Sequence, residues 1–398
     1  MKPTVPSIQK IDRLLIVKTS SIGDVIHALP VVELLKRSHL NMEIGWVVKQ
    51  RCAGVLEGNP WITRLHVVPD SLSFSSAMQI ARELRAARYQ VALDMQGLLA
   101  SGIYTLLSGA PIRIGIDRNR EGNKFFLTHP IVPGKPDAAR TARTAEAPTQ
   151  ILWGSDASQP PSGADSGERD RTISDRHAVE ILYGFADVLG AGSAPSEFEP
   201  QPYLASGSDP APSKLVANVR ETAIGVVALN VGASSKYKQW PAPHWVALTK
   251  QLLAARVAVV FVGDRADATI VESVKAQLSP SPLIVDVSGK TTLRQLAAVL
   301  TQCDVMVTGD TGPMHMAVAV GTPVVALFGS TNPARTGPYG ARNVVLDVHL
   351  PCSPCYRKPT CDGRVDCMVA ITPEAVFTAV SDKLGGDLAA GERGAVHA

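Results

Sequence analysis

Short apolar runs alternate with helix-patterned segments along the first part of this chain, and this alternation constrains the fold more than any other feature. Strand-like runs occupy residues 14–17, 43–48, 65–68 and 91–93, and segments 25–35 and 76–87 between them are helix-like. Pro30 is expected to kink or delay the first of these helices. Strands and helices that alternate at this spacing predict a parallel sheet with helical crossovers.

The same alternation returns, more regularly, in the second half of the 398 residues. Strand-like runs at 224–229, 257–262, 283–287, 304–308 and 323–328 alternate with helix-like segments at 243–255, 267–278, 293–302 and 313–320. Two successive open α/β sheets bind ligands at the carboxyl ends of their strands. We therefore expect an α/β chain with two Rossmann-like domains facing a central cleft.

Changes in composition suggest the domain boundaries. Residues 134–174 are rich in Ala, Pro, Ser, Gly, Asp and Arg, and we interpret them as a mobile surface insertion. A second loose stretch, 191–212, is the best candidate for the linker. The expected organisation is an N-terminal domain over 1–205, a C-terminal domain over 206–384 and a disordered tail over 385–398.

Charge and hydropathy exclude several classes of function. A formal net charge of +3 is too small to argue for nucleic acid, and 5% aromatic residues argue against a single-strand stacking platform. The apolar run near the N-terminus is too short for a signal peptide, and no apolar segment has the length of a membrane span. These features predict a cytoplasmic protein.

The loop at residues 309–313 joins a strand end to a helix start and is a candidate phosphate site. First-turn amides of a helix lack backbone partners and carry partial positive charge, so they bind anions. Gly312 lets a ligand approach the backbone, Thr311 adds a hydroxyl, and His315 can add a donor from the same helix. The alternative is a tight turn in which Asp310 is the N-cap of the helix.

The loop at 18–24 has the same topology in the first domain and could be a second anion site. Asp24 makes that less attractive, because a carboxylate repels phosphate. It suits a general base better, since it can take the proton of an acceptor hydroxyl. The alternative is that Asp24 caps the helix that follows.

The loop at 230–240 carries Ser234, Lys236 and Lys238 after a strand. Lysines beside a diphosphate neutralise the charge that grows on a leaving group. A solvated basic turn would have the same composition, so the lysines leave both interpretations open.

Four cysteines cluster near the C-terminus, at positions 352, 355, 361 and 367. The first spacing suits a structural zinc or iron–sulfur site, but the two longer spacings are not common in zinc fingers. We favour thiols without a metal and expect neither a metal site nor a cofactor.

Several motifs together resemble the lipopolysaccharide heptosyltransferases, glycosyltransferase family 9, which have the two-domain GT-B fold. They lie at residues 15–30 (LIVKTSSIGDVIHALP), 94–98 (DMQGL), 177–180 (HAVE), 238–241 (KQWP) and 309–315 (GDTGPMH). The Cys-rich segment before residues 371–374 (ITPE) also looks like many family members. The insertion at 134–174 is longer than the family usually shows, so the acceptor side departs most from the pattern.

The resemblance implies an inverting transfer of heptose from ADP-L-glycero-D-manno-heptose to the inner core of lipopolysaccharide. Its functional positions fall on Asp24 as the general base, Lys238 near the donor phosphates, and Ser234 beside the pyrophosphate. Asp310 matches the acid that holds sugar hydroxyls, and Thr311 and Gly312 match the phosphate-binding amides. Arg120 and Glu121 look like an Arg-Glu pair on the acceptor side.

The implied partners are the ADP-heptose donor and a lipid-linked saccharide acceptor, either Kdo-lipid A or a heptosylated inner core, without nucleic acid. Peripheral contact with the cytoplasmic face of the inner membrane is expected with such an acceptor. The alternatives are a nucleotide-sugar epimerase of the same fold and a metal-binding or redox protein that uses the four cysteines. A dinucleotide oxidoreductase fits less well, because the Gly-rich fingerprint is absent after the first strand.

Overall fold

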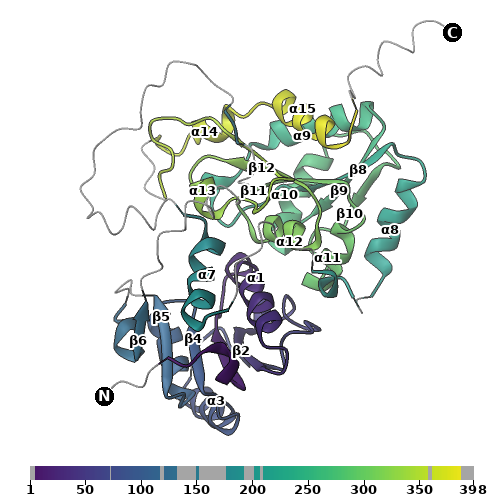
Figure 1. Cartoon of the computed structure of the whole chain (residues 1–398). Coiled ribbons are helices and arrows are strands. Elements are labelled where there is room, and N and C mark those ends of the chain that lie inside the picture. Colours follow the sequence, from purple (N-terminus) through teal and green to yellow (C-terminus); the bar gives the residue numbers. More distant parts are fainter. Residues whose placement is uncertain are drawn as a thin grey trace, which may run out of the picture. The chain divides into compact units, whose positions relative to one another are not determined.

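The computed structural model describes residues 5–71, 73–116, 121–131, 149–151, 176–191, 201–206, 209–356 and 361–386. These residues cluster into two compact units (Figure 1). Unit 1 contains the described residues between 5 and 131 together with 176–191, and unit 2 contains the remainder. No helix among these residues is long and apolar enough to cross a membrane.

Unit 1 is built on a six-stranded sheet with the order β3-β2-β1-β4-β5-β6, and every strand pair is parallel. Its strands are β1 (Arg13–Val17), β2 (Glu43–Lys49), β3 (Arg64–Val68), β4 (Val91–Asp94), β5 (Ile112–Ile116) and β6 (His129–Ile131). Its helices are η1 (Ile8–Lys10), α1 (Ile22–Ser38), α2 (Gln50–Ala53), α3 (Phe74–Ala86), α4 (Leu99–Leu107), η2 (Asn123–Phe126) and α7 (Ala178–Leu189).

Helices cover both faces of this sheet because its strands are apolar on both sides. Leu15 and Val17 of β1 pack in a cluster with Ile80 and Leu84 of α3 and Tyr104 of α4. Helices α1 and α7 pack against each other. Helix α1 begins at Ile22 and continues through Pro30, so the proline does not delay the helix.

Unit 2 is built on a seven-stranded parallel sheet with the order β10-β9-β8-β11-β12-β13-β7. Its strands are β7 (Thr149–Ile151), β8 (Gly225–Asn230), β9 (Val257–Val262), β10 (Ile284–Asp286), β11 (Val305–Gly309), β12 (Val324–Phe328) and β13 (Val344–Asp347). The longer helices are α8 (Ala211–Arg220), α9 (Ala242–Ala254), α10 (Arg265–Lys275), α11 (Leu293–Leu300), α12 (Gly312–Val320) and α15 (Pro373–Lys383). Shorter helices are η3 (Pro202–Leu204), η4 (Lys236–Lys238), α13 (Pro333–Thr336) and α14 (Asp366–Val369).

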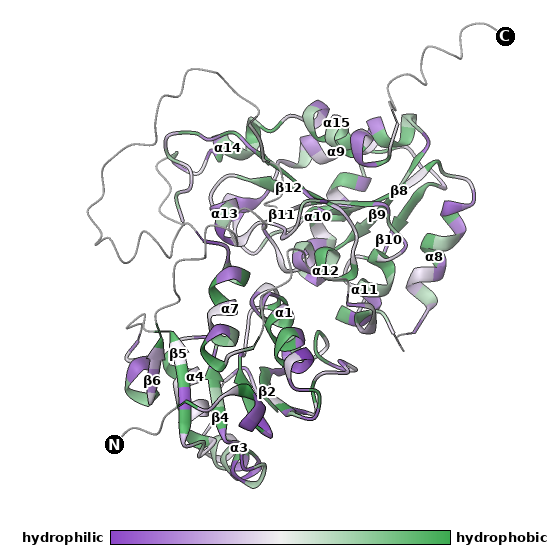
Figure 2. Ribbon diagram, in the orientation of Figure 1, coloured by the Kyte–Doolittle hydropathy of each residue, from purple (hydrophilic) through white to green (hydrophobic). Residues whose placement is uncertain are grey.

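The strands β8 and β9 are buried along their whole length, and Figure 2 shows how hydrophobic the strands of this sheet are. Helix α9 packs against α10 and α15, whereas α11 packs against α8 and α12. Trp240, just before α9, and Trp245, on α9, meet edge to face, with ring centroids 4.8 Å apart. The Trp240 indole N–H donates to the Ile371 carbonyl at 2.8 Å, which ties α15 to the loop before α9.

Apart from the extra strand β7 in unit 2, the two sheets have the same strand order, and this defines where each unit can hold a ligand. In unit 1 the order reverses between β1 and β4, and in unit 2 it reverses between β8 and β11. Val17 pairs with Asp94 across the first junction, and Asn230 pairs with Thr308 across the second. Ligands of open α/β sheets bind beyond the carboxyl ends of the strands at such switch points.

The predicted pair of parallel α/β sheets is confirmed. The expected insertion at 134–174 lies outside the described residues apart from 149–151, which form β7 beside β13. Residues 387–398 of the expected tail also lie outside them. The predicted boundary between residues 205 and 206 stays a prediction.

Candidate active-site residues

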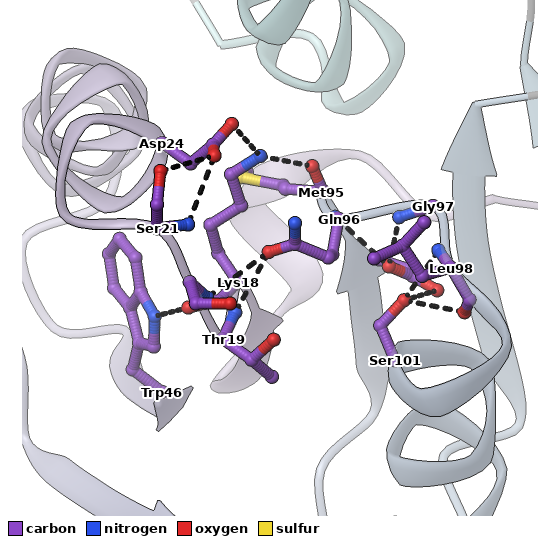
Figure 3. Close-up of polar contacts among 12 residues, drawn as sticks. Lys18, Thr19, Ser21, Asp24, Trp46, Met95, Gln96, Gly97, Leu98 and Ser101 are labelled. Carbon is purple, nitrogen blue, oxygen red and sulfur yellow. Dashed lines mark hydrogen bonds and ion pairs between the residues drawn. The ribbon is translucent and has the colours of Figure 1, made fainter. Parts of the chain in front are cut away.

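The loop after β1 brings together a buried lysine and a half-exposed carboxylate. Lys18 is 6% exposed, and its ammonium lies 3.3 Å from Asp24 Oδ1 and 3.0 Å from the Met95 carbonyl oxygen. The Asp24 side chain, on the first turn of α1, is 43% exposed. Figure 3 shows the ammonium of Lys18 between these two oxygens. Asp24 therefore presents a paired carboxylate that solvent can still reach.

Hydrogen bonds from Ser21 complete the surroundings of Asp24. The Ser21 amide and hydroxyl both donate to Asp24 Oδ2, at 3.0 and 2.9 Å, in the manner of a capping box. Partial burial would raise the pKa of Asp24, but the Lys18 charge and the Ser21 hydrogen bonds outweigh it and lower that pKa. Asp24 thus helps to cap α1 and is also an ionised, accessible carboxylate.

The backbone amides of this loop are already bonded to side-chain oxygens of unit 1. Gln96 Oε1 accepts from the Thr19 amide at 3.1 Å and from the Ser20 amide at 3.3 Å. The Ser21 amide is bonded to Asp24. An anion at this loop would have to displace these oxygens, so the arrangement argues against the second phosphate site considered for residues 18–24.

Asp94 organises the loop that carries Gln96. It is fully buried at the end of β4 and accepts from the amides of Gln96 and Gly97 and from the side chains of Ser101 and Asn123, at 2.6–3.0 Å. Burial raises the pKa of Asp94 although these four donors act in the opposite direction. The motif at residues 94–98 is therefore a scaffold beside the Asp24 loop, from which Gln96 reaches the backbone of Thr19 (Figure 3).

In unit 2, Lys238 and Asp310 form a short ion pair. Lys238 Nζ lies 2.6 Å from Asp310 Oδ2, and the two side chains are 16% and 10% exposed. The same ammonium lies 3.4 Å from the Asp310 carbonyl oxygen. Lys238 comes from η4 after β8, and Asp310 follows β11, so the pair bridges the switch point of this sheet.

Helix α12 begins beside this pair without a side-chain cap. Its N-cap residue is Thr311 in extended conformation, and Gly312 and Pro313 open the first turn. Asp310 is therefore not the N-cap, and the alternative reading of this loop is wrong because the Asp310 carboxylate bonds to Lys238 instead. First-turn amides without a side-chain acceptor are the groups that bind phosphate.

The buried side chain of Asn230 supports the start of α12 through hydrogen bonds. It is 1% exposed, and its amide group donates to the hydroxyls of Thr308 and Thr311, both at 3.1 Å, and to the Gly232 carbonyl at 3.3 Å. The hydroxyls of Thr308 and Thr311 also lie 3.0 Å apart. This buried network fixes the backbone of residue 311, where α12 begins.

The remaining predicted site residues fall in different surroundings. His315 is buried on α12, Gly312 is the first residue of that helix, and Ser234 is exposed in the loop after β8. Glu121 accepts a hydrogen bond from the Leu99 amide at 3.2 Å, at the start of α4. Arg120 lies outside the described residues. The structure thus gathers Lys238, Asp310, Thr311 and Gly312 at one switch point and Asp24 at the other.

The sequence interpretation gave no role to several polar residues of these networks, among them Lys18, Gln96 and Asn230. Lys18 and Gln96 lie within the motifs at residues 15–30 and 94–98, and Asn230 directly follows a predicted strand. Their position at the carboxyl ends of switch-point strands is the signal that would have found them.

The four clustered cysteines are free thiols. Burial, together with the nearby thiols of Cys352, Cys355 and Cys361, raises the pKa of Cys367 to about 11. Among the described residues, no group of three or more His, Cys, Asp or Glu side chains is placed to hold a metal ion.

Comparison with known proteins gives consistent matches. A family model described as glycosyltransferase family 9 (heptosyltransferase) matches residues 77–365. The lipopolysaccharide core heptosyltransferase OpsX of Haemophilus influenzae is 25% identical over 340 residues, which cover 84% of this chain and 84% of that protein. Lipopolysaccharide heptosyltransferase 1 of Pseudomonas aeruginosa is 27% identical over 359 residues, which cover 88% of this chain and 87% of that protein.

A solved structure shares the fold. The structure of E. coli heptosyltransferase WaaC with ADP matches with a TM-score of 0.67 at 20% identity, and the match covers 93% of this chain and 99% of that one. The two α/β units therefore form a GT-B chain, as the resemblance implies.

Proposed function

The chain belongs to glycosyltransferase family 9, the heptosyltransferases, and from this membership we propose that it transfers a heptose from ADP-L-glycero-D-manno-heptose to the inner core of lipopolysaccharide. The transfer inverts the anomeric carbon by direct displacement. One observation carries the proposal: α12 begins without a side-chain cap, and its first turn lies beside the Lys238–Asp310 pair at the switch point of unit 2. Those groups have the chemistry that a nucleotide diphosphate requires.

The donor diphosphate binds in unit 2. The first-turn amides of α12 and the ammonium of Lys238 stabilise the negative charge that develops on the leaving ADP. Asp310 holds Lys238 in place and accepts hydrogen bonds from donor sugar hydroxyls, while Ser234 and His315 add polar contacts to the donor. The loop after β1 in unit 1 is less suited to phosphate, since its amides donate to Gln96 and Asp24.

The acceptor hydroxyl is activated by Asp24. A carboxylate beside this hydroxyl takes its proton as the oxygen attacks the anomeric carbon. The lowered pKa of Asp24 keeps the carboxylate ionised at neutral pH. A base this weak accepts the proton late, when the attacking oxygen has become acidic through bond formation.

The acceptor is a lipid-linked saccharide, either Kdo-lipid A or a heptosylated inner core. OpsX and the Pseudomonas relative are named for lipopolysaccharide, and this supports an acceptor of that class. Arg120 and Glu121 contact the acceptor in this proposal, and the enzyme meets it at the cytoplasmic face of the inner membrane. The named relatives are heptosyltransferases, which favours transfer over the epimerase, oxidoreductase and redox alternatives.

The test is a donor screen combined with an acceptor assay. Purified protein is titrated with ADP-, UDP- and GDP-linked sugars by calorimetry, and product formation is followed with and without Kdo-lipid A and a heptosylated core. The proposal predicts selective binding of ADP-heptose and product only when an acceptor is present. Tight binding of a UDP- or GDP-sugar, or conversion of the donor alone to an epimer, would contradict it.

A further inference from the structure

We propose that Lys18 is a positioning residue for the general base: its buried ammonium, anchored on the Met95 carbonyl, holds the Asp24 carboxylate ionised and oriented toward the acceptor hydroxyl. The inference rests on the proposed function, which assigns the role of the base to Asp24. Lys18 itself acts through Asp24 and need not contact a substrate.

Both ends of Lys18 are fixed within unit 1. Its carbonyl oxygen accepts a hydrogen bond from the indole N–H of Trp46 at 2.9 Å, and Trp46 is fully buried in β2. Its ammonium donates to the Met95 carbonyl at 3.0 Å in a buried contact. Figure 3 shows the extended side chain running between these anchors, with its end beside Asp24.

The burial of the pair is asymmetric. A buried ammonium loses hydration, and an adjacent carboxylate offsets this loss. Lys18 is 6% exposed, whereas the Asp24 side chain is 43% exposed, so the cation belongs to the interior and the anion faces the solvent side. The buried cation is therefore held in place, and the carboxylate that must meet a substrate stays accessible.

Other ionisable side chains surround the loop on neighbouring elements. They are Lys49 at the end of β2, Arg51 and Cys52 on α2, Asp70 after β3, His27 on α1 and His177 before α7. Burial raises the pKa of the Cys52 thiol, with a smaller contribution of the same sign from Asp24, so this thiol is neutral near pH 7. Lys18 is the cation that forms an ion pair with Asp24 among the described residues.

Replacement of Lys18 by Gln tests the inference through a pH profile. The amide of Gln carries no charge, so partial burial then raises the pKa of Asp24 relative to the wild type. Because a base works only when ionised, activity is lost as the pH falls through that pKa. Loss of an adjacent cation shifts a carboxyl pKa by about 1–3 units. We expect the acid limb of kcat/KM, which follows the lowered pKa of Asp24 in the wild type, to move up by at least about one pH unit.

The matched control is Lys36→Gln. Lys36 lies near the C-terminal end of α1, the helix that carries Asp24, and its ammonium also donates to a carbonyl oxygen, that of Met42. Its acid limb should match that of the wild type. ADP affinity and thermal unfolding are measured for both variants, to show that the fold and the donor site are intact. The Asp24 carboxyl is also titrated directly by ¹³C NMR with labelled Asp, assigned by Asp24→Asn, which needs no turnover.

The outcomes separate the two proposals. A wild-type enzyme that transfers no heptose would remove the proposed function, and the NMR titration would still decide the effect of Lys18. If the wild type is active and Lys18→Gln raises neither the acid limb nor the carboxyl midpoint, the inference is wrong. If Lys18→Gln does not fold, Lys18→Arg replaces it. Arg keeps the charge and should retain the wild-type limb, and an acid limb that rises in this variant contradicts the inference.

Discussion

The ammonium of Lys238 lies 2.6 Å from Asp310 Oδ2 and 3.4 Å from the carbonyl oxygen of the same residue. Lys18 has a similar arrangement in unit 1, where its ammonium contacts the carbonyl of Met95, the first residue after β4. Each unit thus places a lysine across its switch point. The carboxylate partner differs: in unit 1 it lies on the helix after the lysine, and in unit 2 it lies on the opposite loop.

Lys238→Ala should weaken the binding of ADP. The substitution removes a cation next to the proposed diphosphate and leaves the Asp310 carboxylate to repel it. Hydrogen bonds to charged groups contribute about 1.5–3 kcal/mol, which corresponds to about a 10- to 100-fold loss of affinity. Calorimetric titration with ADP gives the value. Lys236→Ala is the control on the same short helix, since Lys236 is exposed beside Tyr237, and it should retain wild-type affinity.

Asn230→Asp should weaken ADP binding more than Asn230→Ala does. Both variants lose the amide group that donates to the hydroxyls of Thr308 and Thr311, but only the aspartate places a negative charge beside the start of α12. We expect at least about a tenfold further loss from the charge. Fluorescence competition with an ADP analogue can measure both variants. Equal affinities would show that no anion binds at this helix start.

The expected positions of most strands, and of the loops that carry Asp24 and Lys238, could be read from the sequence because buried parallel strands form short apolar runs. Strands β5, β6 and β13 and helices α4, α8 and α15 were not anticipated. Helix α4, for example, begins after Gly97 and contains Gly102, against which Phe126 and Asn123 pack closely. Such a glycine looks like a helix breaker until the side chains that cover it are known.

The supporting hydrogen bonds could not be predicted, since each joins residues that are far apart in the chain. Gln96 reaches back to the amides of Thr19 and Ser20, and Asn123 reaches the carboxylate of Asp94. A motif shows which residues are near in sequence, whereas these contacts depend on how β4 pairs with β1 and with β5.

Gln96→Ala should slow turnover while leaving ADP affinity unchanged. The substitution releases the amides of Thr19 and Ser20 and loosens the loop that carries Asp24. Gln90→Ala is a matched control, because Gln90 Oε1 also accepts from two successive amides, those of Asp12 and Arg13, before and at the start of β1. A loss of about tenfold or more in kcat for Gln96→Ala alone is expected if base positioning governs the rate. Similar kcat values for the two variants would count against this account.

Trp46→Phe should destabilise unit 1. Phenylalanine fills most of the space of the indole but cannot donate to the Lys18 carbonyl, which Trp46 contacts at 2.9 Å in a buried position. A buried acceptor left without its donor costs about 1–3 kcal/mol, so the midpoint of urea unfolding should fall accordingly. An unchanged midpoint would mean that this hydrogen bond contributes nothing to stability.

The central claim, that Asp24 is the base for a donor held by unit 2, is tested most directly by Asp24→Ala. Turnover with ADP-heptose and a lipopolysaccharide core acceptor should fall by about 10²–10⁴, because general base catalysis contributes that factor. ADP affinity, measured on the same preparation, should stay within about twofold of the wild type, since Asp24 lies in the unit that does not bind the donor diphosphate. Near-normal turnover in this variant would contradict the account.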